Sequence, residues 1–378
     1  MKVLVLNYEY PPVGGGGGRL CAKLCESLAG RGHEIRVVTA GLRHLPEREE
    51  QGGVQIFRPR SFRRREDTCS VPEMALYLIT ALPTALRLAR TWKPDVLHAH
   101  FVAPSGFLAP LTARMGRIPY VVTAHLGDVP GGVPEQTAGL FRVASPVAGW
   151  VWRHAAEVTA VSSFVGGLAH AAWGRAPRVI LNGIPAIPPP EIALSPDGLR
   201  LLFVGRLSIQ KDPLLAVQSL ARIADHRWTL DVIGEGPLGA EMRAAASGLE
   251  GRIRWRGWLP EEGVRALMAR ADALLMTSRQ EGLPMAAVEA LWHGLAIVGS
   301  NIGGLADVIL PNQNGFLCER TPASFADALA RLANNPGQLA SMRQASLGLA
   351  GRFDFQETVS AYERVLGQAV SAKKHPGK

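Results

Sequence analysis

The sequence has few of the features that mark secreted or membrane-spanning proteins. Its 378 residues hold only four cysteines and no CxxC pair, so we expect buried thiols in a reducing compartment, without a disulfide framework. The longest apolar stretch, residues 74–86, is shorter than the ~18 residues that a membrane-spanning helix needs, and Pro83 interrupts it. The opening MKVLVLNY runs straight into prolines and glycines, unlike a signal peptide. These absences predict a cytoplasmic protein.

Aromatic residues are also scarce, at 6%, and no strand-like stretch combines them with basic residues, which argues against nucleic-acid binding. The chain is nevertheless basic, since 41 lysines and arginines against 32 acidic residues give a formal charge of +9. A positive protein attracts anionic partners. Phosphorylated metabolites and anionic membranes therefore stay as candidates.

The order of apolar runs predicts two α/β domains, each a doubly wound parallel sheet. The length is sufficient for about two hydrophobic cores. Residues 2–8 form a continuous apolar run, as expected for a strand buried on both faces. Further strands are expected at residues 33–40, 94–100, 119–125, 157–162, 178–184, 199–205, 228–234, 252–257, 273–278 and 295–300. Five prolines in residues 185–198 cannot continue a strand or helix, so we place the linker there.

Two glycine-rich loops raise the question of phosphate binding. Residues 14–18 are all glycine and fill the first strand-to-helix turn, where the backbone can approach an anion at the helix N-terminus; a flexible turn is the alternative. A complete GxGxxG occurs at Gly234, Gly236 and Gly239 and suggests a dinucleotide site. It follows the second strand of its half instead of the first, and the next strand does not end in an acid that could hold a ribose. An NAD-dependent oxidoreductase is therefore the weaker interpretation.

Charged residues follow two other strands of the second half. Gly205 ends one strand, and Arg206 and Lys211 follow it in VGRLSIQKD, which suits a diphosphate. In SRQEGLPMAAVEAL, Glu281 precedes a turn and Glu289 lies on the helix beyond it. Alternatively, Arg206 and Lys211 are solvated cations without a ligand. In the same interpretation, Glu281 caps a helix and Glu289 is an exposed acid on that helix.

Together with YPPVGGGG, DVLHAH, VTAHLGD and VILNGI, these motifs resemble the retaining family 4 glycosyltransferases of the GT-B fold, the glycosyl transferases group 1. The resemblance covers nearly the whole chain. It implies two Rossmann-like domains facing a cleft, with residues 1–187 binding the acceptor and residues 188–355 the nucleotide-sugar donor. It also implies a final helix at about residues 356–372 that packs back on the first domain, followed by a basic tail, residues 371–378.

The resemblance gives the candidate residues roles. Arg206 and Lys211 look like the pair that neutralises the leaving diphosphate. Glu281 resembles the acid that binds the transferred sugar, and Glu289 the acid that binds the ribose. His125 resembles a histidine that faces the sugar, although a histidine packed at the edge of the core would fit too. The other donor-binding positions that the resemblance implies are Gly15, Gly16, Gly205, Gly257, Trp258, Gly282, Leu283, Pro284 and Met285.

Two departures from the family pattern are visible. The usual EGFG is EGLP here, so Pro284 removes one backbone donor, and Asp307 stands where glutamate is commoner in GG-x-x-E. Neither departure threatens the assignment to the class, but the first bears on sugar selectivity.

No DxD motif occurs, so we expect no metal and no other cofactor; cationic side chains and helix N-termini would stabilise the leaving diphosphate. The resemblance implies front-face attack, in which the departing phosphate takes the acceptor proton. His98 and His100 form an HxH pair that could suggest a metal ligand set, but no third ligand is near, and packing at the strand end is preferred.

The acceptor is the least determined partner. RPRSFRRRED places five arginines between Arg58 and Arg65, shortly before the apolar residues 74–86. Such a pair of segments can lie on an anionic membrane and suggests a lipid-linked or glycan acceptor; a solvated loop before a core helix is the alternative. UDP is favoured over GDP from family frequency alone. A sugar-nucleotide epimerase of the same fold and a non-catalytic nucleotide-sugar binder remain as alternatives.

Overall fold

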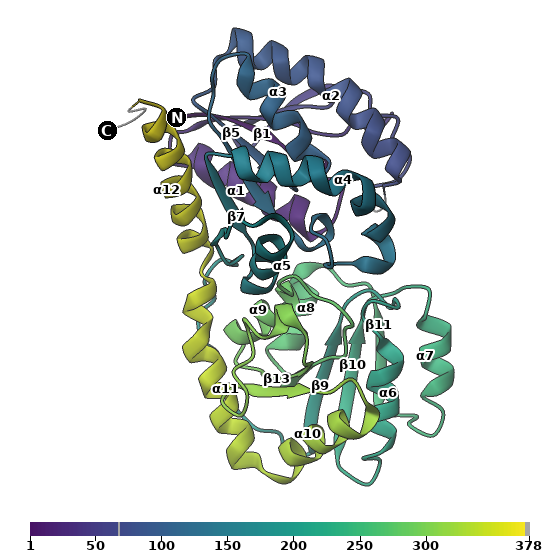
Figure 1. Ribbon diagram of the computed structural model, residues 1–378. Helices are drawn as coiled ribbons and strands as arrows, with labels where there is room; N and C mark the ends of the chain where they lie inside the picture. Colours follow the sequence, from purple (N-terminus) through teal and green to yellow (C-terminus); the bar gives the residue numbers. More distant parts are fainter. Residues whose placement is uncertain (67–68, 375–378) are drawn as a thin grey trace. The chain divides into compact units, whose positions relative to one another are not determined.

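The computed structural model describes residues 1–66 and 69–374, which form two α/β units (Figure 1). The first unit contains Met1–Asn182 and the C-terminal segment from Gln356 onward, and the second contains Gly183–Phe355. The division falls a few residues before the boundary at residue 187 that the proline-rich linker suggested.

The first unit is built on an eight-stranded sheet in the order β3-β4-β2-β1-β5-β6-β7-β8. Its strands are β1 (Lys2–Leu6), β2 (Glu34–Val38), β3 (Arg48–Gln51), β4 (Val54–Phe57), β5 (Val96–His100), β6 (Tyr120–Ala124), β7 (Glu157–Ala160) and β8 (Arg178–Val179). All neighbours are parallel except β3 and β4. The strand order reverses between β1 and β5, so the loops after these two strands flank the position where such sheets bind ligands.

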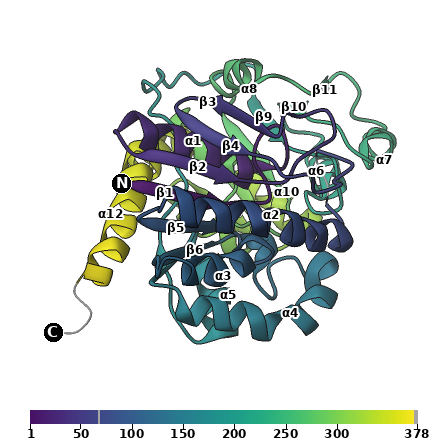
Figure 2. The same cartoon turned by 90° about the horizontal axis from the view of Figure 1, so that it is seen from above.

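Helices cover both faces of this sheet. They are α1 (Gly16–Gly30), α2 (Val71–Thr91), α3 (Leu108–Arg114), α4 (Pro134–His154), α5 (Ser163–Trp173) and α12 (Phe355–Lys374), with short 3-10 turns at η1 (Ser105–Phe107) and η2 (Leu126–Asp128). Figure 2 shows α2, α3, α4 and α5 on one side of the central strands and α1 on the other. Helix α1 buries Leu20, Cys21, Leu24, Cys25 and Leu28, a helical spacing that gives it one apolar face.

The second unit is built on a six-stranded parallel sheet in the order β11-β10-β9-β12-β13-β14. Its strands are β9 (Leu199–Val204), β10 (Trp228–Ile233), β11 (Ile253–Gly257), β12 (Ala273–Met276), β13 (Ala296–Ser300) and β14 (Gly315–Cys318). Its helices are α6 (Pro213–Ala221), α7 (Gly239–Ala245), α8 (Glu261–Met268), α9 (Met285–Trp292), α10 (Pro322–Asn334) and α11 (Pro336–Ala350), with 3-10 turns at η3 (Gly303–Leu305) and η4 (Gly351–Phe353). The strand order reverses between β9 and β12.

A buried ionic cluster fixes the end of the linker to the second unit. The Asp272 carboxylate accepts hydrogen bonds from Arg200 at 2.7 Å and from Arg343 at 2.8 Å. Both guanidinium groups also donate to the carbonyl oxygen of Ala193, at 2.9 and 3.1 Å. Because each charge has a partner and the linker backbone is bound as well, this cluster holds the linker against the start of β9.

Some sequence-based expectations were wrong in detail. Strands β3, β4 and β14 were not anticipated, and the strand expected at residues 178–184 is only Arg178–Val179. Residues 371–374 of the expected tail belong to α12, and the rest of that tail lies outside the described residues. In the described part of the chain, no helix combines the length and apolarity needed to cross a membrane.

Candidate active site

Lys211 and Glu281 meet where the strand order of the second sheet reverses. Lys211 follows β9 and Glu281 follows β12, and their Nζ and Oε1 atoms are 2.5 Å apart. The lysine side chain is 22% exposed and the glutamate side chain 8%. Ser278 donates a second hydrogen bond of 2.7 Å to the same carboxylate oxygen. The structure thus brings together two residues that the sequence places 70 positions apart.

Hydrogen bonds tie the two loops to each other along their backbones. The Thr277 hydroxyl donates to the carbonyl oxygens of Lys211 and Asp212, at 3.1 and 2.7 Å. The Arg279 backbone N–H donates to the carbonyl oxygen of Gln210 at 2.7 Å. Thr277 and Ser278 were not among the predicted residues, although two hydroxyl residues directly after a buried strand are a usable signal. They position the loops that carry the cation and the acid.

Helix α9 begins immediately after this pair. Gly282, Leu283 and Pro284 form the turn, Pro284 is the N-cap residue, and Met285 is the first helical residue. A neighbouring glycine permits the turn, because a β-carbon on Gly304 would lie 2.2 Å from the carbonyl oxygen of Glu281. The glycine pair before Asp307 therefore has a packing reason in this chain.

Glu289 lies on α9, but Arg265 of α8 already binds it. The Arg265 Nε atom lies 3.0 Å from Glu289 Oε1, and the same guanidinium pairs with Glu261. Arg265 was not predicted, and its position in an ordinary amphipathic helix gave no signal. Any hydroxyl ligand of Glu289 would meet a carboxylate whose orientation Arg265 fixes.

The remaining predicted donor residues lie on loops after β9 and β11. Gly205 has φ of +150° and Gly257 has φ of +66°, conformations that favour glycine. The side chain of Arg206 is exposed, and Trp258 is 71% exposed. These residues are at the carboxyl edge of the sheet, as the sequence predicts, and Gly205 lies against Lys211, since a β-carbon on Gly205 would lie 3.3 Å from the lysine Cε atom.

The GxGxxG glycines serve backbone packing. A β-carbon on Gly234 would lie 2.0 Å from the carbonyl oxygen of Gly205, and one on Gly236 would lie 2.4 Å from that of Leu207. The loop after β10 is hydrogen-bonded to the loop after β9, since Leu207 N–H donates to Glu235 and Leu238 N–H donates to Leu207, both at 2.9 Å. The first two glycines are thus required by neighbouring backbone without a dinucleotide.

In the first unit, the glycine run leads into α1. A β-carbon on Gly15 or Gly16 would meet no heavy atom within 4 Å, so this part of the loop borders open space. The Gly15 N–H donates to the Glu9 carboxylate at 3.1 Å. A negative group therefore already lies at the N-terminus of α1, where partial positive charge favours it.

His125 lies beside this loop and is buried. Its ring stacks on Phe101 with centroids 4.2 Å apart, and its Nε2 atom lies 3.4 Å from Nδ1 of His100. A β-carbon on Gly17 would lie 3.4 Å from the His125 ring. Burial lowers the pKa of His125 well below the usual range, and His100 adds to the shift, so His125 is a neutral imidazole near pH 7.

Asp128 sets the backbone around His125 and was not predicted. Its carboxyl group accepts hydrogen bonds from the N–H groups of His125, at 2.6 Å, and of Val102. Burial raises the pKa of Asp128 to about 8, although these two hydrogen bonds act in the opposite direction. Asp128 thereby joins the loops after β5 and β6.

The HxH pair packs within the sheet edge. His98 Nε2 lies 2.8 Å from the Thr123 hydroxyl, and the rings of His98 and His100 have centroids 4.2 Å apart. Within residues 1–66 and 69–374, no three histidine, cysteine, aspartate or glutamate side chains are grouped so that they could hold a metal ion. The expected independence of metal ions stays a prediction.

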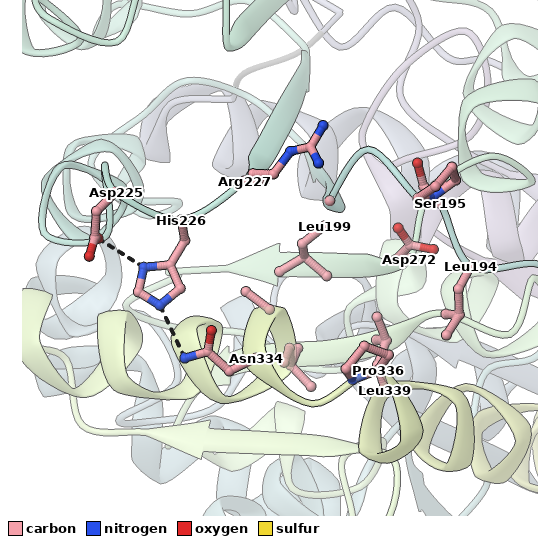
Figure 3. A pocket seen from close by; sticks show the side chains of 14 residues that line it. Leu194, Ser195, Leu199, Asp225, His226, Arg227, Asp272, Asn334, Pro336 and Leu339 are labelled. Carbon is pink, nitrogen blue, oxygen red and sulfur yellow. Dashed lines mark hydrogen bonds and ion pairs between the residues drawn. The ribbon is translucent and has the colours of Figure 1, made fainter.

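A cavity of about 610 Å³ lies at the opposite edge of the second sheet (Figure 3). It borders the starts of β9 and β10, near Leu199 and Arg227. Figure 3 shows His226 between Asp225 and Asn334, with hydrogen bonds of 2.9 and 3.2 Å. These polar groups bind one another, and the cavity is remote in the sheet from Lys211 and Glu281.

Comparisons with known proteins agree over both units. Residues 14–186 match the profile of Glycosyltransferase Family 4, and residues 198–335 match that of Glycosyl transferases group 1. The chain is 30% identical over 379 residues to a 2-deoxystreptamine glucosyltransferase of Streptomyces kanamyceticus, with 92% of this chain and 98% of that protein covered.

Solved structures agree as well. The chain is similar to sucrose-phosphate synthase from Thermosynechococcus elongatus, with a TM-score of 0.83, 19% identity, and 98% of this chain and 99% of that chain covered. It is also similar to HepE of Anabaena in complex with UDP, with a TM-score of 0.76, 19% identity, and coverage of 97% and 100%. These neighbours confirm the predicted GT-B fold, with two parallel-sheet α/β domains.

Proposed function

The chain belongs to glycosyltransferase family 4, the glycosyl transferases group 1, and we propose that it is a retaining hexosyltransferase using a nucleoside-diphosphate sugar. UDP is the favoured nucleotide, with GDP as the alternative. A structural neighbour solved with UDP supports this choice, and a relative named a glucosyltransferase supports transfer of a hexose. The acceptor is a glycan or a lipid-linked hydroxyl compound.

One observation carries the proposal. The Lys211 ammonium and the Glu281 carboxylate lie 2.5 Å apart at the strand-order reversal, directly before the N-terminus of α9. A cation and a helix N-terminus suit a diphosphate, and a carboxylate suits sugar hydroxyls. The exposed Arg206 supplies a second positive charge on the same loop as Lys211.

The reaction needs one bond to break and one to form. The bond between the anomeric carbon and the diphosphate oxygen breaks, and the acceptor oxygen bonds to that carbon on the same face. The acceptor proton passes to an oxygen of the departing diphosphate. Arg206, Lys211 and the α9 N-terminus stabilise the negative charge that develops on that diphosphate, a role that needs fixed cations and dipoles.

The other predicted residues bind the two ends of the donor. Glu289 holds the ribose hydroxyls, with Arg265 fixing its orientation at 3.0 Å. Gly257 and Trp258 lie beside the base. In the first unit, Gly15 and Gly16 approach the diphosphate, and His125, a neutral imidazole, positions the sugar or the acceptor. The four cysteines form no disulfide, which fits our proposal of a cytoplasmic reaction.

A thermal unfolding panel tests the donor assignment. UDP, GDP, ADP, TDP and NAD are added separately to the protein in EDTA. A ligand present at 100 times its Kd adds about 2.7 kcal/mol to the free energy of unfolding, which raises Tm measurably. We expect UDP to stabilise the protein, or GDP in its place. Stabilisation by NAD alone, or by none of the five, would contradict the donor site.

Product analysis separates transfer from its alternatives. With the stabilising nucleotide as a sugar donor, we expect release of nucleoside diphosphate that depends on an acceptor and persists in EDTA. Conversion of the donor to its epimer without an acceptor would identify an epimerase. Donor binding without turnover in a broad panel of glycan and lipid-linked acceptors would identify a binding protein, and activity restored only by Mg²⁺ or Mn²⁺ would contradict metal independence.

A further inference from the structure

A groove of about 860 Å³ lies in the first unit beyond the carboxyl ends of β2 and β4. Residues 42–44 after β2 and residues 62–65 after β4 form two of its walls, and the first turn of α2 closes it. In a parallel sheet, this is the same edge at which the glycine run follows β1 and His125 follows β6. The groove therefore belongs to the ligand-binding edge of this unit.

Two of the five arginines after β4 hold the groove wall in place. Arg58 is buried and donates to the Glu49 carboxylate and to the carbonyl oxygens of Tyr10 and Pro11. Arg63 is buried too and donates to the carbonyl oxygens of Tyr8, Arg65 and Glu66. Neither of the two interpretations that the sequence left open, a membrane-facing segment and a solvated loop, includes the structural role of these two buried arginines.

The exposed charges of the groove are mainly positive. Arg43, Arg64 and Arg65 line it with exposed side chains. The acid among the lining residues, Glu73, is engaged at the N-terminus of α2, where it accepts hydrogen bonds from the Ser70 N–H and hydroxyl and from the Arg64 N–H, at 2.6 to 3.0 Å. Hydrogen bonds from Ser70, with the nearby Arg63 charge, lower the pKa of Glu73.

His44 and Glu66 complete the charges around the groove. His44 lies 3.5 Å from Glu66, and both side chains are more than half exposed. Among the described residues that line or border the groove, the exposed charged side chains of Arg43, Arg64, Arg65 and Glu66 carry more positive than negative charge. An anion that entered would meet guanidinium groups, which bind phosphate oxygens in pairs.

The groove also has an apolar wall. Phe62 is 60% exposed and has φ of +55°, a backbone conformation that non-glycine residues rarely adopt. Leu76 of α2 lines the same groove and is exposed as well. Exposing an aromatic ring on a strained backbone is unfavourable without a ligand, and strained residues concentrate at binding sites.

A backbone hydrogen bond links the segment that forms the groove wall to the glycine run. The Gly14 N–H donates to the carbonyl oxygen of Glu66 at 2.7 Å. Arg58 and Arg63 bind the loop after β1 as described above, so the groove wall and the proposed donor-contacting loop form one connected structure. The segment after β4 that forms this wall is thus hydrogen-bonded to the loop that carries Gly15 and Gly16.

We propose that this groove binds the acceptor and that the acceptor carries a phosphate group next to an apolar portion. Arg43, Arg64 and Arg65 bind the phosphate, and Phe62 and Leu76 contact the apolar portion. This inference rests on the proposed glycosyltransferase function, because it names the acceptor class of that reaction.

Calorimetric titration with octyl phosphate, below its critical micelle concentration and with UDP saturating, tests the proposal. Octyl glucoside and inorganic phosphate are the comparison ligands. We expect octyl phosphate to bind most tightly, and Arg43→Gln/Arg64→Gln to weaken it at least about tenfold, as loss of charged hydrogen bonds implies. Arg90→Gln/Arg114→Gln is the matched control, since it removes two exposed charges at the ends of α2 and α3 and should bind like the parent.

A second pair of variants tests the apolar wall. Phe62→Ser should weaken octyl phosphate and leave inorganic phosphate unchanged, whereas Met115→Ser, another exposed apolar residue, should change neither. Equal loss in both arginine variants, or no binding of octyl phosphate, would overturn the proposal. So would arginine-dependent binding only to phosphatidylglycerol vesicles, which would indicate a membrane surface.

The titration also separates this inference from the proposed function. If UDP fails to raise Tm while octyl phosphate binds as expected, the donor site is wrong and the anion groove stands on its own as a binding site. If UDP raises Tm and the groove variants behave like the control, the donor site stands and the acceptor proposal is rejected.

Discussion

The Lys211 ammonium donates a 2.5 Å hydrogen bond to the Glu281 carboxylate, although the two residues follow different strands of the second sheet. The cation assigned to the diphosphate is thus paired with the acid assigned to the sugar. The pair gives the charge on each residue a partner. In the proposed donor complex, Lys211 would be shared between the carboxylate and a phosphate oxygen, which would couple recognition of the sugar to recognition of the diphosphate.

Glu281→Gln should have opposite effects on binding of the nucleotide and on transfer of the sugar. The amide keeps the shape and can still accept the Ser278 hydrogen bond, but without a negative charge it binds Lys211 less strongly. We expect UDP to bind about fivefold more tightly, equivalent to about 1 kcal/mol for a partly exposed pair. Transfer should fall at least about 100-fold, because the sugar loses its orientation.

Calorimetry with UDP and steady-state kinetics measure the two effects of Glu281→Gln. Glu250→Gln, on an exposed turn before β11, is the control for loss of one negative charge. Weaker UDP binding in Glu281→Gln would show that the carboxylate does not compete with the nucleotide.

Lys211→Met should weaken recognition of the phosphates and leave recognition of the base unchanged. The variant loses a fixed cation at the leaving group, so we expect kcat/KM to fall by at least about 100-fold. UDP affinity should fall, and uridine affinity should stay the same because uridine has no phosphate. Arg222→Met, at the exposed end of α6, provides the control. A parallel loss of uridine binding would mean that Lys211 supports the base pocket instead.

Gly236→Ala and Gly239→Ala should differ sharply. The first places a β-carbon 2.4 Å from the Leu207 carbonyl oxygen, whereas the second meets only a leucine methyl at 3.5 Å. Overpacking of this kind costs about 1–3 kcal/mol. We expect a clear fall in Tm for Gly236→Ala alone. Equal stability of the two variants would contradict the packing role of this glycine.

Asp272→Asn should destabilise the second unit. It leaves the buried Arg343 guanidinium without its countercharge, which costs about 3–5 kcal/mol when a buried pair is broken. Asp197→Asn changes an exposed acid 3.8 Å from Arg227 and should stay within about 0.5 kcal/mol of the parent. Urea unfolding monitored by tryptophan fluorescence measures both. A small effect of Asp272→Asn would show that the cluster does not need its charge.

Buried histidines should lower stability below about pH 6.5, whereas Asp128, with its pKa raised to about 8, acts in the opposite direction. Burial, reinforced by His100 and His125, lowers the pKa of His98 well below its ordinary 6.5. As pH drops through 6.5, the unfolded chain binds a proton that the folded chain does not, so the free energy of unfolding decreases by up to about 1.4 kcal/mol per pH unit for each such group. The stabilisation is therefore present above pH 6.5 and lost below it.

His98→Gln tests this pH dependence. The variant should show a shallower decline in the urea midpoint between pH 7.5 and 5.5, because one proton-binding group has left the unfolded chain. The control, His154→Gln, replaces an exposed histidine of α4 and should decline like the parent. Identical slopes for the parent and His98→Gln would contradict the lowered pKa.

The sequence predicted the central strands because strands buried on both faces consist mainly of apolar residues. Every residue of β5, β6, β12 and β13 is buried, and apolar residues predominate in each of these strands. Strand β3, with the sequence REEQ, was missed because it is an antiparallel edge strand without a buried residue. Its pairing with β4 depends on backbone groups, which leave no pattern in the side chains.

Site residues were likewise predicted where their side chains form a pattern in the sequence, and missed where their role depends on contacts made in the fold. Lys211 and Glu281 could be named because charged residues after buried strands are unusual, but their direct contact depends on the strand order. The structural roles of Arg58 and Arg63 could not be found, because their partners include the backbone carbonyl groups of a loop about 50 residues earlier. Arg265 could not be distinguished from the other helix arginines until its partner Glu289 was located.

Helix α12 has a consequence for how the chain is synthesised. It supplies Tyr362, Val365 and Leu366 to the buried interior of the first unit, and the Tyr362 ring lies 5.4 Å from that of His98. The ribosome makes these residues only after the whole second unit. All strands of the second unit are therefore synthesised before α12, the last helix of the first unit. We expect the first unit, although its synthesis begins first, to complete its folding last.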